Sequence, residues 1–132
     1  EAKRVTKPGG IILVAYVMNE YAVVMYGIAE NKLTESINSG MLSDDFHTIP
    51  GPESLYDFVR IEDINGFNEE VGLVREIIIS PDGPANYIRP FVNKLDEESF
   101  EQFVNYQMAT CERPDLIGAG AHTVDILRKV NT

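Results

Sequence analysis

The chain has 132 residues, of which 44% are hydrophobic and 24% are charged. This composition excludes a disordered or low-complexity protein and predicts one globular domain over residues 1–132. The formal net charge of -10 argues against nucleic acid and anionic membrane surfaces as partners, because an acidic surface repels both. Cys111 is the single cysteine and cannot form an internal disulfide, which favours a cytoplasmic protein.

The beginning of the chain reads as the last turns of a helix. Residues 1–6 carry no capping side chain in front of them, and Lys3, Arg4 and Lys7 stand where cations favour a helix end. We therefore expect a fragment of a longer protein. The longest apolar run, residues 11–17, is far shorter than the roughly 20 residues that cross a bilayer, so no membrane partner is predicted.

The predicted elements follow from residue patterns taken in chain order. Pro8, Gly9 and Gly10 end the first helix, and the branched apolar run 11–17 predicts a strand buried on both faces, with a buried helix as the competing interpretation. Helical spacing and β-rich runs alternate after it. The expected elements are a helix over 19–39, a loop over 43–54, a helix over 64–71, a strand over 73–80, a hard turn over 81–84, a helix over 96–108 and a last strand over 122–130.

This order predicts an α/β fold with a small three-stranded sheet and helices on its faces. The first strand would then have an open apolar edge, and exposed edges of that kind are normally covered. We expect either a missing N-terminal half or a second copy of the chain along this edge. Self-association into a homo-oligomer, such as a dimer, is therefore predicted.

The opening residues resemble a motif of class I S-adenosylmethionine-dependent methyltransferases. In that family a helix ends in an Arg-Val-Leu-Lys-Pro-Gly-Gly-type turn that leads into the fifth strand of a Rossmann-like sheet. Thr6 stands here where the family usually has Leu. The matching positions are Arg4, Val5, Lys7, Pro8, Gly9 and Gly10.

Later segments resemble the same family in the same order. Residues 63–73 are similar to the helix and turn before its sixth strand, and residues 116–129 to the turn and seventh strand of its small-molecule enzymes. The resemblance implies that the last strand lies antiparallel between the other two. Gly118, Ala119 and Gly120 precede a predicted strand rather than a helix, so they do not form a cofactor loop. S-adenosylmethionine is thus expected for the complete protein and not for this chain alone, and no cofactor-binding residue is assigned.

The resemblance also implies that residues 19–54, a helical insertion and loop, form a lid over the substrate. His47 lies in this segment and is the candidate general base or substrate contact, because imidazole titrates near neutral pH. The alternative is a solvent-facing loop histidine. Asp44 and Asp45 beside it do not make a metal site by sequence alone, and no metal is predicted.

Aromatic and cationic side chains are the other candidates for substrate contact. Methyl transfer needs an aligned acceptor and the exclusion of water, which aromatic walls would provide, whereas core packing is the alternative. Arg60 and Arg89 could hold an anionic substrate or form surface ion pairs. The aromatic candidates are Tyr16, Tyr21, Tyr26, Phe46, Tyr56 and Phe58, of which Tyr16, Tyr21 and Tyr26, with His47 and Arg60, form the predicted substrate-binding set.

His122 and Cys111 are interpreted as structural. His122 stands at the entrance to the last predicted strand, and neither residue has a catalytic partner that the sequence identifies.

The sequence therefore predicts the C-terminal part of a methyltransferase that acts on a small molecule and is inactive alone. The alternative is a non-catalytic α/β module for oligomerisation or interaction.

Overall fold

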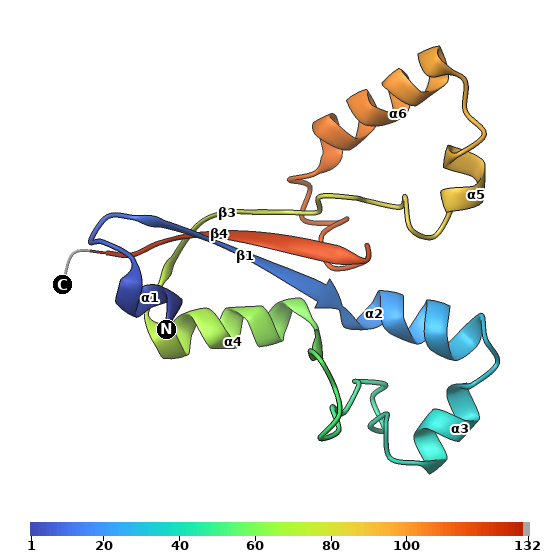
Figure 1. Cartoon of the computed structure of the whole chain (residues 1–132), viewed down its shortest axis with the longest axis horizontal. Coiled ribbons are helices and arrows are strands. Elements are labelled where there is room, and N and C mark those ends of the chain that lie inside the picture. The colour runs from blue at the N-terminus through green and yellow to red at the C-terminus, as the bar shows by residue number, and fades with distance from the viewer. Residues whose placement is uncertain (131–132) are drawn as a thin grey trace.

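The computed structural model describes residues 1–130, and its elements follow one another along an elongated molecule (Figure 1). They are α1 (Ala2–Val5), β1 (Ile11–Met18), α2 (Asn19–Ala22), the π-helix η1 (Val23–Ile28), α3 (Leu33–Asn38), β2 (Phe58–Val59), α4 (Ile61–Val71), β3 (Val74–Ile79), α5 (Arg89–Val92), α6 (Glu97–Thr110) and β4 (His122–Arg128).

The sheet is mixed and has the strand order β2-β1-β4-β3. β4 runs antiparallel to both β1 and β3 and lies between them, as the resemblance implied. The prediction of three strands was wrong, because Phe58 and Val59 add a short fourth strand parallel to the end of β1. Two residues are too few to give a periodic signal in the sequence.

The turn before β1 depends on its glycines. Gly9 has φ 76°, in the left-handed region, and a Cβ on Gly10 would lie 2.6 Å from Cγ2 of Thr6. The backbone of this turn continues the pairing of β1 with β4, since Gly9 N donates to Lys129 O at 2.8 Å. The Lys129 ammonium donates to the carbonyls of Lys3 and Thr6, where a cation stabilises the end of a helix.

One face of the sheet is covered by α4. Ile64 of α4 is fully buried and packs with Met18 and Val59. Beneath the centre of the sheet, the buried Asp125 carboxylate accepts a hydrogen bond from the Asn68 amide at 2.7 Å. It also accepts from Nε and Nη2 of the Arg75 guanidinium at 2.8 and 2.9 Å. A buried charge is tolerated only when it is paired in this way.

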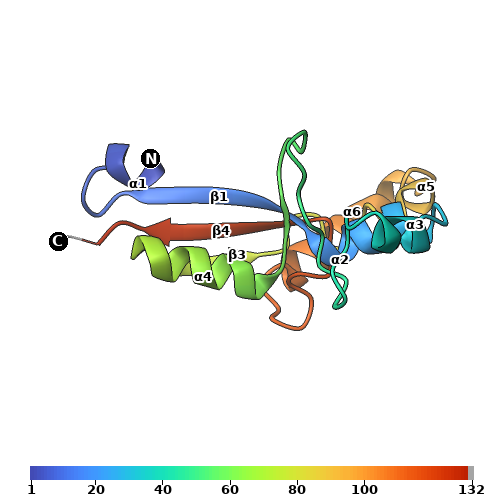
Figure 2. The same cartoon turned by 90° about the horizontal axis from the view of Figure 1, so that it is seen from below.

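The opposite face of the sheet is largely open (Figure 2). Strand alternation directs Ile11 and Leu13 to this face, and their exposed fractions are 42% and 68%. The outer edge of β1 is also free over residues 11–16 within the described part of the chain, because β2 pairs only with Val17 and Met18. An apolar face and an unpaired edge of this kind are normally covered by another element.

The expected single helix over 19–39 is divided. α2 continues into η1, and Asn31 then takes φ 55° before α3 begins. Asparagine tolerates this left-handed conformation, so the chain reverses and α3 returns against η1, with a Cβ on Gly27 only 3.2 Å from Leu33 Cδ1. Helical spacing persisted through the turn, which is why the sequence did not reveal it.

The other predicted helices form with small changes in their bounds. α4 begins at Ile61, earlier than expected, and ends where Gly72 takes φ 63°. The predicted cap of α6 is present, because the Asp96 carboxylate accepts from Ser99 N at 2.8 Å. No helix within residues 1–130 is both long and apolar enough to span a membrane.

Candidate functional site

Several helices gather at one end of the molecule. In both views α2, α3, α5 and α6 lie beyond the end of the sheet at which β1 finishes (Figures 1 and 2). β3 runs parallel to β1, so its carboxyl end lies there as well. Ligands of α/β proteins bind outside the carboxyl ends of parallel strands, which makes this end the place to look for a site.

Asn19 fixes the loop that follows α3 to the end of β1. Its side chain is fully buried, donates to Phe46 O at 3.0 Å and accepts from Thr48 N at 2.8 Å. Two backbone groups 27 and 29 residues away are thereby held against α2. Asn19 is therefore one of the side chains that position residues 42–48.

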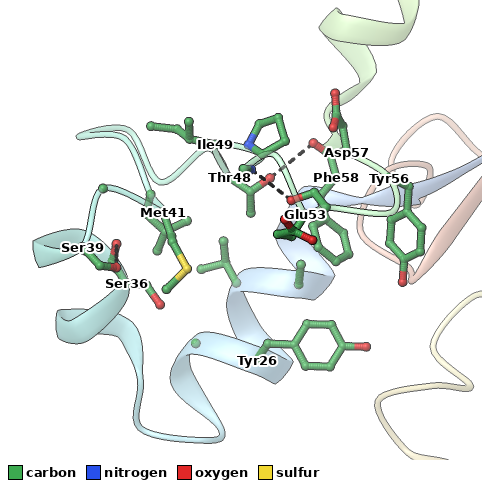
Figure 3. Close-up of a pocket in the computed structure, with 18 of the residues that line it drawn as sticks. Tyr26, Ser36, Ser39, Met41, Thr48, Ile49, Glu53, Tyr56, Asp57 and Phe58 are labelled. Atoms are coloured by element: carbon green, nitrogen blue, oxygen red, sulfur yellow. Dashed lines mark hydrogen bonds between the residues drawn. The ribbon is translucent and has the colours of Figure 1, made fainter.

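A cavity of about 640 Å³ lies between α2, η1, α3 and the loop before β2 (Figure 3), and we call it the large cavity. Its volume is in the range of small-molecule sites. Aliphatic and aromatic side chains, among them Met41, Ile49 and Phe58, line it together with the hydroxyls of Ser36 and Thr48. All its lining residues lie within 22–58, so the cavity is built largely from the predicted lid segment.

A row of five aromatic rings begins in the large cavity and leads away from it, and we call it the aromatic row. Consecutive ring centroids are 5.5, 6.2, 6.1 and 5.0 Å apart, distances at which aromatic pairs attract each other. Burial raises the pKa of the Tyr21 and Tyr87 hydroxyls, so these rings remain neutral near neutral pH. The members in order are Tyr56, Phe58, Tyr26, Tyr21 and Tyr87.

A second, small cavity of about 140 Å³ lies where the aromatic row ends. It is lined by Tyr87, Gln107 and Ser80, at the carboxyl end of β3. Ser80 Oγ is buried and has no hydrogen-bond partner within the described residues. A space of this size would hold a few water molecules, one of which could satisfy the hydroxyl.

His47 is held in an ion pair rather than directed into the large cavity. Its Nε2 lies 2.6 Å from the Asp63 carboxylate and its Nδ1 lies 2.8 Å from Thr48 O. The hydrogen bond to Asp63 raises the pKa of His47. Both ring nitrogens are thus engaged, which leaves none to take a proton from a substrate in this arrangement.

Asp63 belongs to the beginning of α4. The carboxylate also accepts from Arg60 N at 2.7 Å. Burial raises its pKa, but the hydrogen bonds from Arg60 N and His47 outweigh burial, so the pKa of Asp63 is lowered overall. The pair therefore ties the lid segment to the start of α4.

Arg60 is engaged in the same region. Its guanidinium donates to Glu20 at 2.5 Å, to the Asp45 carboxylate at 3.1 Å and to Asp45 O at 2.8 Å. The hydrogen bond to Glu20 raises the pKa of Arg60. This arginine holds the loop to α2 and does not line the large cavity.

The remaining predicted aromatic residues are dispersed. Tyr26, Tyr56 and Phe58 line the large cavity and Tyr21 joins the aromatic row. Tyr16 instead stacks on Phe67 of α4 at 6.4 Å, with the ring planes 25° apart.

Sequence reasoning missed Tyr87. This residue follows the turn 81–84 at the carboxyl end of β3, and that position beside a second parallel strand was the available signal.

The side chains interpreted as structural have local partners. His122 Nδ1 lies 2.6 Å from the Asp82 carboxylate, which also accepts from the Asn86 amide at 2.6 Å. Cys111 is a partly buried free thiol at the end of α6. Within residues 1–130 no three His, Cys, Asp or Glu side chains lie close enough to hold a metal ion.

Comparison with models of known protein families gives no match for the chain, and comparison with curated proteins gives no significant match either.

Proposed function

We propose that the chain is the C-terminal part of a class I S-adenosylmethionine-dependent methyltransferase that acts on a small molecule. The observation that carries this proposal is the position of β4, antiparallel between β1 and β3, together with the Pro8-Gly9-Gly10 turn that leads into β1. This strand arrangement and this turn are what the resemblance to the family implies.

The large cavity supports an acceptor site in this part of the molecule. It lies at the carboxyl end of β1, where α/β proteins bind ligands, and its volume of about 640 Å³ suits a small molecule. In this proposal residues 19–54 act as the substrate lid. The chain's share of catalysis is then to bind the acceptor and exclude water while a sulfonium methyl group is transferred, leaving S-adenosylhomocysteine.

The open side of the sheet supports a missing partner. Leu13 is 68% exposed on the uncovered face, and residues 11–16 of β1 present an unpaired edge. In a complete methyltransferase the cofactor-binding half would cover this side. We propose a cytoplasmic enzyme that uses S-adenosylmethionine only when that half is present.

The same open side favours the alternative function, a non-catalytic module that associates with itself. Two copies that pair their β1 edges would bury the same exposed backbone groups and apolar side chains. The two proposals differ in what the free edge accepts, which is the cofactor-binding half in one and a second copy in the other.

Titration calorimetry with S-adenosylmethionine tests the proposed function. The samples are residues 1–132 alone and the longest polypeptide that the gene encodes around them. We expect binding by the longer polypeptide and none by residues 1–132. A longer polypeptide that does not bind, or a gene that encodes nothing longer while residues 1–132 form a stable dimer, would refute the enzyme and support the module.

A further inference from the structure

The large cavity is acidic and contains no cationic side chain in its lining. Glu53 and Asp57 are among the residues that line it, whereas no lysine, arginine or histidine is. Figure 3 shows both acids among the residues around the cavity. A cavity of this charge disfavours anionic ligands and leaves neutral and cationic ones.

The two cations described above, Arg60 and His47, are paired with other acids and not with Glu53. Arg60 is bound by Glu20 and Asp45, and His47 is paired with Asp63. Glu53 itself takes part in none of the hydrogen bonds and ion pairs formed within residues 1–130. Its carboxylate is therefore available to a ligand at the rim of the cavity.

Aromatic rings form the wall beside this carboxylate. Phe58 lies between Tyr56, in edge contact at 5.5 Å, and Tyr26, tilted at 6.2 Å. All three side chains and Glu53 are among the residues that line the large cavity (Figure 3). Aromatic faces carry partial negative charge and attract organic cations, and quaternary ammonium groups are bound in this way.

We propose that the large cavity binds a small molecule carrying an organic ammonium group, held by the Phe58, Tyr26 and Tyr56 rings and by the Glu53 carboxylate. This inference rests on the proposed function only in taking that molecule to be the methyl acceptor. The apolar remainder of the cavity, around Met41 and Ile49, holds the rest of the molecule. Binding itself requires neither the cofactor nor the proposed cofactor-binding half.

A titration with three probes of the same shape separates charge from size. The probes are choline, its neutral analogue 3,3-dimethylbutan-1-ol and the anion 3,3-dimethylbutanoate. Amide signals of Tyr26, Gly27 and Phe58 in the ¹⁵N-labelled chain report occupancy of the cavity. We expect choline to bind about fivefold more tightly than the alcohol, and the anion to bind most weakly.

Matched variants test whether Glu53 and Phe58 cause the preference for choline. Glu53→Gln is expected to weaken choline about threefold to tenfold and to leave the alcohol unchanged. Glu101→Gln on α6 makes the same change in net charge away from the cavity and should have no effect. Phe58→Leu should weaken choline by a similar factor, whereas Phe100→Leu on α6 should not, and β1 amide shifts show whether each variant is folded.

Two results would overturn the inference. One is equal affinity of the native chain for choline and its neutral analogue, and the other is equal choline affinity of the Glu53→Gln and Glu101→Gln variants. Neither depends on methyl transfer. A longer polypeptide that fails to bind S-adenosylmethionine refutes the proposed function and leaves the binding result as it stands, so the two failures are distinguishable.

Discussion

The α4 side of the sheet and the carboxyl end of β1 are built in opposite ways. Beneath the sheet, Ile64 is fully buried and the Asp125 carboxylate is completely paired with Arg75 and Asn68. At the carboxyl end of β1 there are a cavity of about 640 Å³, half-exposed rings and an acid, Glu53, that forms no ion pair within residues 1–130. The comparison teaches that buried packing and paired charge lie on the α4 side, whereas the other end has an open cavity that we propose binds a ligand.

The largest loss of stability is expected when the buried charge loses its partner. Arg75→Ala leaves Asp125 uncompensated, and breaking such a pair costs about 3–5 kcal/mol. Urea unfolding measures the change. Arg113→Ala is the control, because Arg113 pairs with Asp115 on the surface and such pairs contribute about 0–1 kcal/mol. Equal losses of unfolding free energy from the two substitutions would contradict the conclusion that the buried pair on the α4 side stabilises the fold more than a surface pair does.

Truncating core and open-face residues compares the two faces of the sheet directly. Ile64→Ala should cost about 2–5 kcal/mol, because it leaves a void beneath the sheet. Leu13→Ala should change the free energy of unfolding by less than about 0.5 kcal/mol in the isolated chain, because Leu13 is exposed. A loss at Leu13 as large as that at Ile64 would mean that a second copy already covers the open face.

Asn19 holds the loop of residues 42–48 against the end of β1, and its loss should loosen that loop locally. Asn19→Ala leaves Thr48 N and Phe46 O without their partner, which costs about 1–3 kcal/mol for buried groups. Thermal unfolding gives the loss, and hydrogen exchange should show faster exchange in residues 42–48 and not in β4. Uniformly faster exchange throughout the chain would argue against a local role for Asn19.

The smallest expected effect is a pH dependence from the His47–Asp63 pair. The pKa of His47 is raised above its ordinary value of 6.5. Its contribution is therefore fully present below pH 6.5 and is lost as the pH rises through the folded-state pKa. The pKa of Asp63 is lowered from 3.8, so its contribution is present above pH 3.8 and is lost as the pH falls through the folded-state value.

His47→Gln isolates the histidine part of this dependence. Unfolding free energies of the native chain and the variant, measured between pH 5 and 8, should differ by about 1 kcal/mol at the acidic end and converge towards the alkaline end. A difference that grows with pH would show that the pair is not formed.

The sheet was largely predictable from the sequence because its strands carry strong local signals. The apolar run 11–17 and the Pro8-Gly9-Gly10 turn mark β1, and Gly72 marks the end of α4. β2 was not predictable, since Phe58 and Val59 form a strand only by pairing with β1. The turn at Asn31 was hidden for a related reason, because helical spacing continues on both of its sides.

The candidate site was predictable only in part. Tyr26 was expected to contact substrate and lines the large cavity, whereas Arg60 and His47 are taken up by ion pairs with acids from distant segments. Which acid meets which cation is decided by the tertiary fold, so residue type and loop position could not reveal it. Glu53, on which the ammonium proposal depends, carries no sequence signal that separates it from other surface acids.

The most direct measurement of the central claim is the formation of S-adenosylhomocysteine by the longest polypeptide that the gene encodes. The assay supplies S-adenosylmethionine and a mixture of small metabolites, and compares the native protein with its Phe58→Leu variant. The account predicts turnover by the native protein and a loss of about tenfold in the variant, because Phe58 lines the acceptor cavity. No turnover, or equal turnover by both proteins, would contradict it.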